Sequence, residues 1–176
     1  MKFSAQIAVA CLSAGALAHV APRALSDFQQ VLTTVQTDVD NLDSAINAFT
    51  GNTAPVQSAA TTLVNDINSG NSQLSGQPVL SLADTFTLNN QVTSFKNHAK
   101  TLVTDIKAKR PTVISTGNCG LVRDNVNAIN TAAGALIQTI VAKANPSAKS
   151  IAEGQAKDIQ AILDDGKAYY TTANCP

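Results

Sequence analysis

The most constraining feature of this sequence is a set of apolar residues that recur every three or four positions. In the first stretch they run from Phe28 through Val35 to Phe49, and four later stretches repeat the pattern. This spacing is typical of an amphipathic α-helix, and no stretch shows the sustained alternation of a half-buried strand. We therefore predict an all-α fold without a sheet. Short connections make consecutive helices antiparallel, so the expected architecture is a five-helix antiparallel bundle.

Capping and breaking residues indicate where the five helices begin and end. Side-chain hydroxyls that can cap a first turn stand at Ser26, Ser81 and Ser147. Pro111 is expected to stop the third helix, with a linker over residues 112–118. Gly70, inside the second helix, is expected to weaken it by roughly 1 kcal/mol relative to Ala.

Composition bounds the class of protein. The chain has 176 residues, of which 44% are hydrophobic and 14% charged, and its formal net charge is zero. This is enough apolar material for one buried core in a single domain. A neutral chain with 4% aromatic residues and no Trp lacks the basic surface and the stacking side chains that nucleic-acid binding uses. We therefore expect no nucleic-acid partner.

Residues 1–18 have the organisation of a secretory signal peptide. Lys2 gives a charged start, residues 7–17 are apolar, and Ala16 and Ala18 form a small-x-small cleavage pattern. The apolar run is too short to span a bilayer as a helix. We expect cleavage after Ala18, which leaves residues 19–176 as one secreted, extracellular helical-bundle domain.

After that cleavage two cysteines remain, Cys119 and Cys175. In an oxidising compartment they most simply form one disulfide, and two separate thiols are the alternative. The expected topology offers a check, because Cys119 begins the fourth helix and Cys175 follows the fifth. Antiparallel packing of these two helices would bring both cysteines to the same end of the bundle.

Residues that could form a catalytic or metal site are almost absent. Glu153 is the only Glu, and His19 and His98 are the only histidines. No His-x-x-x-His, Cys-x-x-Cys or Gly-x-Ser-x-Gly motif occurs. A catalytic His also needs a partner that orients it. We therefore expect no enzyme activity, no catalytic residue, no metal site and no cofactor.

The apolar stripes allow two interpretations. They are built from Val, Ile, Leu and Ala with few Phe, so they could leave a tunnel between the helices. They could equally interdigitate into a solid core, which the usual close packing of protein interiors favours.

A basic patch in the third stretch also allows two interpretations. It contains Lys96, Lys100, Lys107, Lys109 and Arg110. These cations could attract a carboxylate or anionic lipid head group. They could also form a solvated face that complements the acidic first helix.

The whole pattern resembles the fungal hydrophobic surface binding protein A family, which includes cell-wall galactomannoproteins. The resemblance rests on the signal sequence, the all-helical length and two runs of residues. These runs are Val35, Val39, Leu42, Ile46 and Phe49 before Gly51, and then Pro55, Val56, Leu63 and Ile67. The resemblance implies a secreted helical bundle that adsorbs to hydrophobic surfaces. For some members it implies a fatty acid held between the helices, or recruitment of a polyester-degrading hydrolase.

We therefore predict a secreted, non-enzymatic protein that binds hydrophobic surfaces or carries fatty acids or similar amphiphiles in an apolar tunnel between helices. The alternative is a structural cell-wall or surface protein or antigen with a solid core and no ligand. Wall-linked members have Ser/Thr-rich or anchor-bearing tails that this sequence lacks, so we expect a freely secreted form. The expected lining residues are Phe28, Leu32, Val35, Phe86, Phe95, Leu102, Val126, Ile129, Ile159 and Ile162. The expected head-group residues are Lys96, Lys100 and Lys107.

Overall fold

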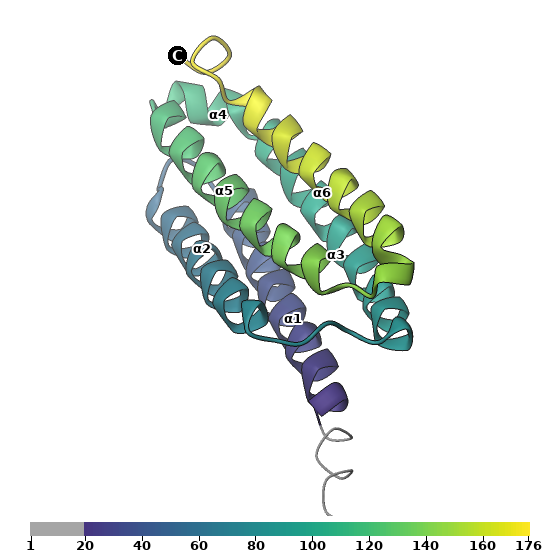
Figure 1. Cartoon of the computed structure of the whole chain (residues 1–176). Coiled ribbons are helices and arrows are strands. Elements are labelled where there is room, and N and C mark those ends of the chain that lie inside the picture. The colour runs from purple at the N-terminus through teal and green to yellow at the C-terminus, as the bar shows by residue number, and fades with distance from the viewer. Residues whose placement is uncertain (1–19) are drawn as a thin grey trace, which may run out of the picture.

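The five apolar stripes fold into five long helices, and a short sixth helix lies between the third and the fourth of them (Figure 1). The computed structural model describes residues 20–176, and the expected signal peptide lies outside them. The helices are α1 (Val20–Asn47), α2 (Ala54–Ser75), α3 (Leu82–Ala108), α4 (Arg110–Ser115), α5 (Cys119–Lys143) and α6 (Lys149–Tyr169), with a 3-10 turn, η1 (Pro146–Ala148), before α6. The described part has no strand, as predicted, but the expected count of five helices is wrong.

The additional helix arises because Pro111 begins a helix as well as ending one. α3 stops at Ala108, and Pro111 lies in the first turn of α4. A proline there loses no helical hydrogen bond, because the earliest N–H groups have no partner within the helix. Val113 is buried, which gives this single short helix an apolar contact with the bundle.

The structure confirms one of the three predicted caps. The Ser81 hydroxyl accepts a hydrogen bond from the backbone N–H of Asp84 at 3.1 Å. Ser26 lies inside α1, which begins at Val20, so its predicted cap is wrong. Ser147 lies in η1, where its backbone N–H donates to the side chain of Asn145 at 3.0 Å, so its predicted role as a cap is also wrong.

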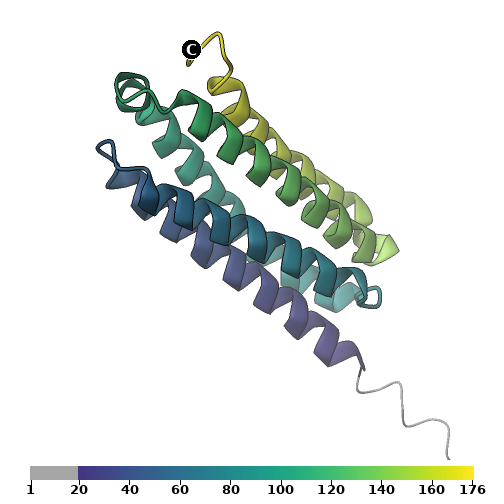
Figure 2. The same cartoon turned by 90° about the vertical axis from the view of Figure 1, so that its left-hand side faces the viewer.

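The five long helices form a closed ring in the order α1, α2, α5, α6, α3. α1 packs on α2 and α3, α2 on α5, and α6 on both α5 and α3. Figure 2 shows these helices lying along one common direction. Five helices in a ring leave more space along their axis than three or four do, so the centre must be filled by side chains or left partly open.

Among the five long helices, those consecutive in sequence alternate in direction, yet three of the packed pairs run parallel. The last turns of α1 and α3 meet where Asn47 donates to Asp105 at 2.9 Å. Similarly, Thr139 near the end of α5 donates to Asn71 near the end of α2 at 2.6 Å. The α3–α6 pair is the third. This order arises because residues 76–81 cross the end of the bundle, so that α2 and α3 are not neighbours (Figure 1).

A disulfide joins Cys119 and Cys175, as predicted. Their Cα atoms are 5.4 Å apart, and the bond links the start of α5 to the segment after α6. Both cysteines are buried. The bond closes a loop of 56 residues, which in the chain-entropy model stabilises the fold by about 4 kcal/mol.

Gly70 has a packing role that its helix propensity does not reveal. It is buried where α2 meets α1, and a Cβ atom at this position would lie 2.5 Å from Val31 Cγ1. The predicted weakening concerns the helix propensity of Gly70 alone, and packing opposes a larger residue here because an added Cβ would overlap Val31.

Candidate functional site

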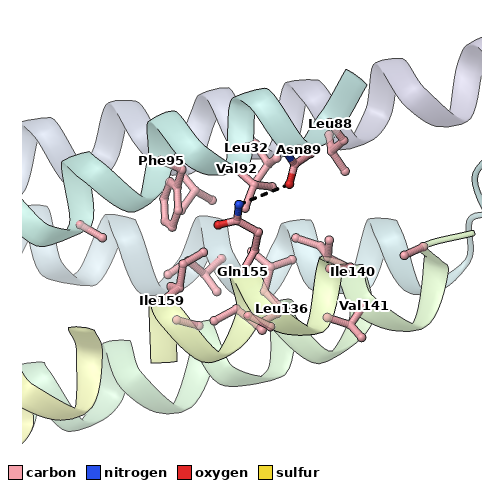
Figure 3. Close-up of a pocket in the computed structure, with 18 of the residues that line it drawn as sticks. Leu32, Leu88, Asn89, Val92, Phe95, Leu136, Ile140, Val141, Gln155 and Ile159 are labelled. Atoms are coloured by element: carbon pink, nitrogen blue, oxygen red, sulfur yellow. Dashed lines mark hydrogen bonds between the residues drawn. The ribbon is translucent and has the colours of Figure 1, made fainter. Parts of the chain in front are cut away.

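An apolar cavity of about 100 Å³ lies along the axis of the ring (Figure 3). All five long helices contribute to its wall, with Leu32 from α1, Leu63 from α2, Phe95 from α3, Leu136 from α5 and Ile159 from α6. The cavity is of the same order as an apolar cavity of about 150 Å³ that stays dry and binds benzene in another protein. A site of this kind can take hydrocarbon and offers little to a polar solute.

Alanines at inward positions leave this space unfilled. They line the cavity from several elements where a larger aliphatic side chain would close it. They are Ala99, Ala133, Ala144, Ala148, Ala152 and Ala156. Because a packed interior relaxes only partly around missing methyl groups, small residues facing one another leave a void.

Three polar side chains interrupt the apolar wall, namely Thr85, Asn89 and Gln155. Gln155 extends from α6 towards α3, where its Nε2 donates to Asn89 Oδ1 and Thr93 Oγ1, each at 3.3 Å (Figure 3). The other end of the amide, Oε1, is buried and accepts no hydrogen bond. Thr85 is already engaged, since its hydroxyl accepts the backbone N–H of Asn145 at 3.1 Å.

Exposed apolar side chains gather where α3 and α6 begin. Phe86 and Ile151 line the cavity and are 49% and 43% exposed, so they form its rim. Leu82, one turn before Phe86, and Val79 in the preceding connection are exposed as well. These four residues are here called the rim cluster, and two of them, Phe86 and Ile151, continue the apolar lining out to the surface.

The structure brings seven of the ten predicted lining residues together in this one cavity. They are Leu32, Val35, Phe86, Phe95, Leu102, Ile129 and Ile159. Phe28 is fully buried in the core outside it, and Ile162 is half-buried and does not line it. Val126 lines a second cavity of about 40 Å³, between α4, α5 and the first two helices.

Sequence reasoning named no alanine among the expected lining residues, although it expected alanines on the apolar stripes, and it missed the polar group at Gln155. The helical period did place Gln155 on the apolar stripe of α6, four residues before Ile159. A lone amide on such a stripe is the signal that could have identified it.

The three predicted head-group lysines lie outside the cavity lining. Lys96 pairs with Asp158 of α6 at 3.0 Å, and Lys107 pairs with Asp165 at 2.8 Å. Lys100 is exposed. The two ion pairs tie α3 to α6 along the outside of the bundle, where exposed pairs contribute about 0–1 kcal/mol each.

Other chemistry-bearing groups do not assemble into a site. His98 Nδ1 lies 2.6 Å from Asp40 Oδ1 on the surface between α1 and α3. Residues 20–176 contain no group of three or more His, Cys, Asp or Glu side chains placed to hold a metal. No helix in the described part is both long and apolar enough to cross a membrane. His19 lies outside the described residues.

Solved structures share this fold. Ligand-binding domain 1 of the Penicillium marneffei MP1 protein, solved with arachidonic acids, superposes with a TM-score of 0.81 at 19% identity over 85% of this chain and 99% of that chain. The structure of AFMP4P in complex with palmitic acid has a TM-score of 0.77 at 28% identity, over 86% of this chain and 99% of that chain.

Sequence relatives place the chain in a family. Cell wall mannoprotein 1 of Aspergillus flavus is 27% identical over 171 residues, which are 97% of this chain and 63% of that protein. Its namesake in Aspergillus fumigatus is 29% identical over 81% of this chain and 51% of its own length. The chain thus spans about half to two thirds of these relatives. The model of the family described as hydrophobic surface binding protein A matches residues 25–142. The chain belongs to the hydrophobic surface binding protein A family.

Proposed function

We propose that this protein binds fatty acids or similar long-chain amphiphiles in the central cavity. The observation that carries the proposal is the apolar void on the axis of the five-helix ring. Each buried CH₂ group gains about 0.8 kcal/mol before the costs of binding are subtracted. Two neighbours in fold, the MP1 domain and AFMP4P, were solved with arachidonic and palmitic acid, which supports the same ligand class for this chain.

Loading requires the bundle to expand. Pockets for drug-sized ligands measure about 300–1,000 Å³, and this cavity is about 100 Å³. Partly buried side chains on α3, α5 and α6 surround it, including Val92, Ile137 and Leu163. We expect these side chains and their helices to move apart when an acyl chain enters.

Uptake of palmitic acid tests this proposal. The ligand-stripped protein is incubated with palmitic acid, and native mass spectrometry counts bound molecules. Ala156→Leu, on the cavity wall, should reduce uptake, whereas Ala161→Leu on the exposed side of α6 should not. A wild-type protein that takes up no palmitic acid would overturn the proposal and favour a structural protein with no ligand.

The rim cluster supports a second function, adsorption to hydrophobic solids. Scattered exposed apolar residues are normal, but a group that continues an apolar cavity is typical of an interaction site. Retention on hydrophobic beads should fall for the double variant Phe86→Ser/Ile151→Ser. Ile114→Ser is the matched control, because Ile114 is 41% exposed at the opposite end of the bundle, in α4. Equal retention of all three proteins would contradict adsorption through the rim cluster.

The remaining parts of this function are also proposals. The mannoprotein relatives support an extracellular or cell-wall location. The ligand-binding domain that shares the fold supports action by binding. A secreted polyester hydrolase as partner stays a prediction from the family resemblance. Co-adsorption of the two proteins on polyester film is the measurement that checks it.

A further inference from the structure

One residue of the cavity wall, Gln155, carries a side-chain hydrogen-bond acceptor without a donor. Gln155 Oε1 is buried and unpaired, although Nε2 of the same amide makes two hydrogen bonds to α3. A buried polar atom left without a partner costs about 1–3 kcal/mol. Because Gln155 lines the cavity, a ligand that widens the cavity and brings a donor to Oε1 would recover that cost.

Charge is missing from the same wall. None of the described residues that line the cavity is Asp, Glu, His, Lys or Arg. A carboxylate taken into such a space without a cation pays a large desolvation cost, and it would meet the like partial charge of Oε1. The interior therefore suits an uncharged donor and disfavours an anion.

We infer that the cavity selects amphiphiles whose head group enters uncharged and donates an O–H hydrogen bond to Gln155 Oε1. This inference rests on the proposed function and specifies the head group for it. The ligand class is a hydrocarbon chain that ends in a hydroxyl group or a protonated carboxylic acid. Asn89 is a positioning residue, because its Oδ1 holds the Gln155 amide across the α3–α6 seam.

Three ligands with the same ten-carbon chain distinguish a hydroxyl donor from a carboxylic-acid donor and from no donor. They are 1-decanol, decanoic acid and methyl decanoate, which has no donor. Equilibrium dialysis against the ligand-stripped full chain gives each affinity. At neutral pH the alcohol should bind about three- to tenfold more tightly than the ester, the range expected for one net hydrogen bond.

The acid should bind more tightly as the pH falls through the pKa of its own carboxyl group, while binding of the alcohol should not change. The alcohol is the necessary control, because titratable groups on all five surrounding helices lie outside the cavity lining and could still act through stability. These groups include Asp27 and Asp38 on α1, Asp66 on α2, Asp84 and Lys96 on α3, Lys143 on α5, and Glu153, Lys157 and Asp158 on α6.

Gln155→Met tests the acceptor, and Gln160→Met is its matched control. Gln160 lies on the same helix and bonds through Nε2 to Asn130 and Asp164, outside the cavity. Gln155→Met should remove the preference for alcohol over ester and keep ester binding, whereas Gln160→Met should keep the preference.

The possible failures are distinguishable. If no compound binds, the proposed function fails and the inference fails with it. If all three compounds bind equally, or the preference survives Gln155→Met, the hydrocarbon site stands and the head group lies elsewhere, so only the inference is overturned. Unequal folding of the two variants would appear in their affinity for the ester, which serves as an internal reference.

Discussion

At the scale of single residues, Asp38 destabilises the folded protein at neutral pH. Its side chain is buried between α1 and α2, and its Oδ2 accepts no hydrogen bond. Burial raises its pKa from 3.8 to about 6, and hydrogen bonding and repulsion with Asp66 add to the shift. Because the folded state holds this proton more tightly than the unfolded state, the unfolding free energy falls as the pH rises from about 4 to about 6.

Asp38→Asn should therefore stabilise the protein at neutral pH, by up to about 3 kcal/mol, and should have little effect below about pH 4. Urea denaturation at both pH values measures the difference. Asp124→Asn, at an exposed position on α5, is the control and should show no such pattern. An equal effect of Asp38→Asn at both pH values would refute the burial argument.

Two glycines in helix interiors should respond in opposite ways to the same substitution. Gly70→Ala should destabilise the protein by about 1–3 kcal/mol, because the added Cβ overlaps Val31. Gly154→Ala should stabilise it by roughly 1 kcal/mol, since nothing lies within 4 Å of that position and Ala is the better helix former. Thermal melts of the two variants check the pair. Adding Val31→Ala should relieve the first overlap and recover part of the loss.

At the scale of elements, the sequence predicts helices well and their neighbours poorly. The period of three and four residues identified all five long helices, because every turn of such a helix places an apolar residue on the buried face. α4 was missed because Pro111 was interpreted only as a stop. The ring order was not predicted, because a short connection such as residues 76–81 indicates the direction of consecutive helices and not which helices pack together. Their path across the bundle depends on contacts such as Leu80 N–H to Lys143 O, at 2.8 Å, that no local pattern encodes.

The same limit applies to the cavity. Leu32, Phe95 and Ile159 were predictable as lining, because each lies on an inward stripe. Phe28 lies on the same stripe as Leu32 but packs into the solid core. Periodicity predicts which side chains point inward. It does not predict how completely the facing helices fill the space in front of them, which depends on residues of those helices such as Ala133 and Ala156.

The α5–α6 hairpin should depend on its disulfide. Cys119→Ser/Cys175→Ser should lower the unfolding free energy by up to about 4 kcal/mol. The loss should be concentrated at the end where α5 begins and α6 stops. Hydrogen exchange should therefore quicken at the start of α5 more than at its end near Lys143, which backbone and side-chain bonds tie to residues 77–80. A variant with an unchanged melting temperature would contradict this role.

At the scale of the whole molecule, binding capacity and stability should oppose each other. An apolar void costs about 24 cal/mol per Å³, so a cavity of about 100 Å³ lowers stability by about 2 kcal/mol relative to a filled interior. A ligand that occupies the cavity stabilises the fold by about 2.7 kcal/mol at one hundred times its Kd, and the recovered part of the cavity cost is included in that figure. The ligand-free protein is thus less stable than the ligand-bound protein.

Ala156→Leu should consequently raise the melting temperature of the ligand-free protein while abolishing most of the further rise that palmitic acid produces in the wild type. Ala161→Leu should change neither quantity, because its added methyl groups face solvent. Differential scanning calorimetry with and without palmitic acid measures both quantities for all three proteins. A filled variant that is less stable when empty would show that the wall is already close-packed at Ala156 and that the cavity opens elsewhere along the axis.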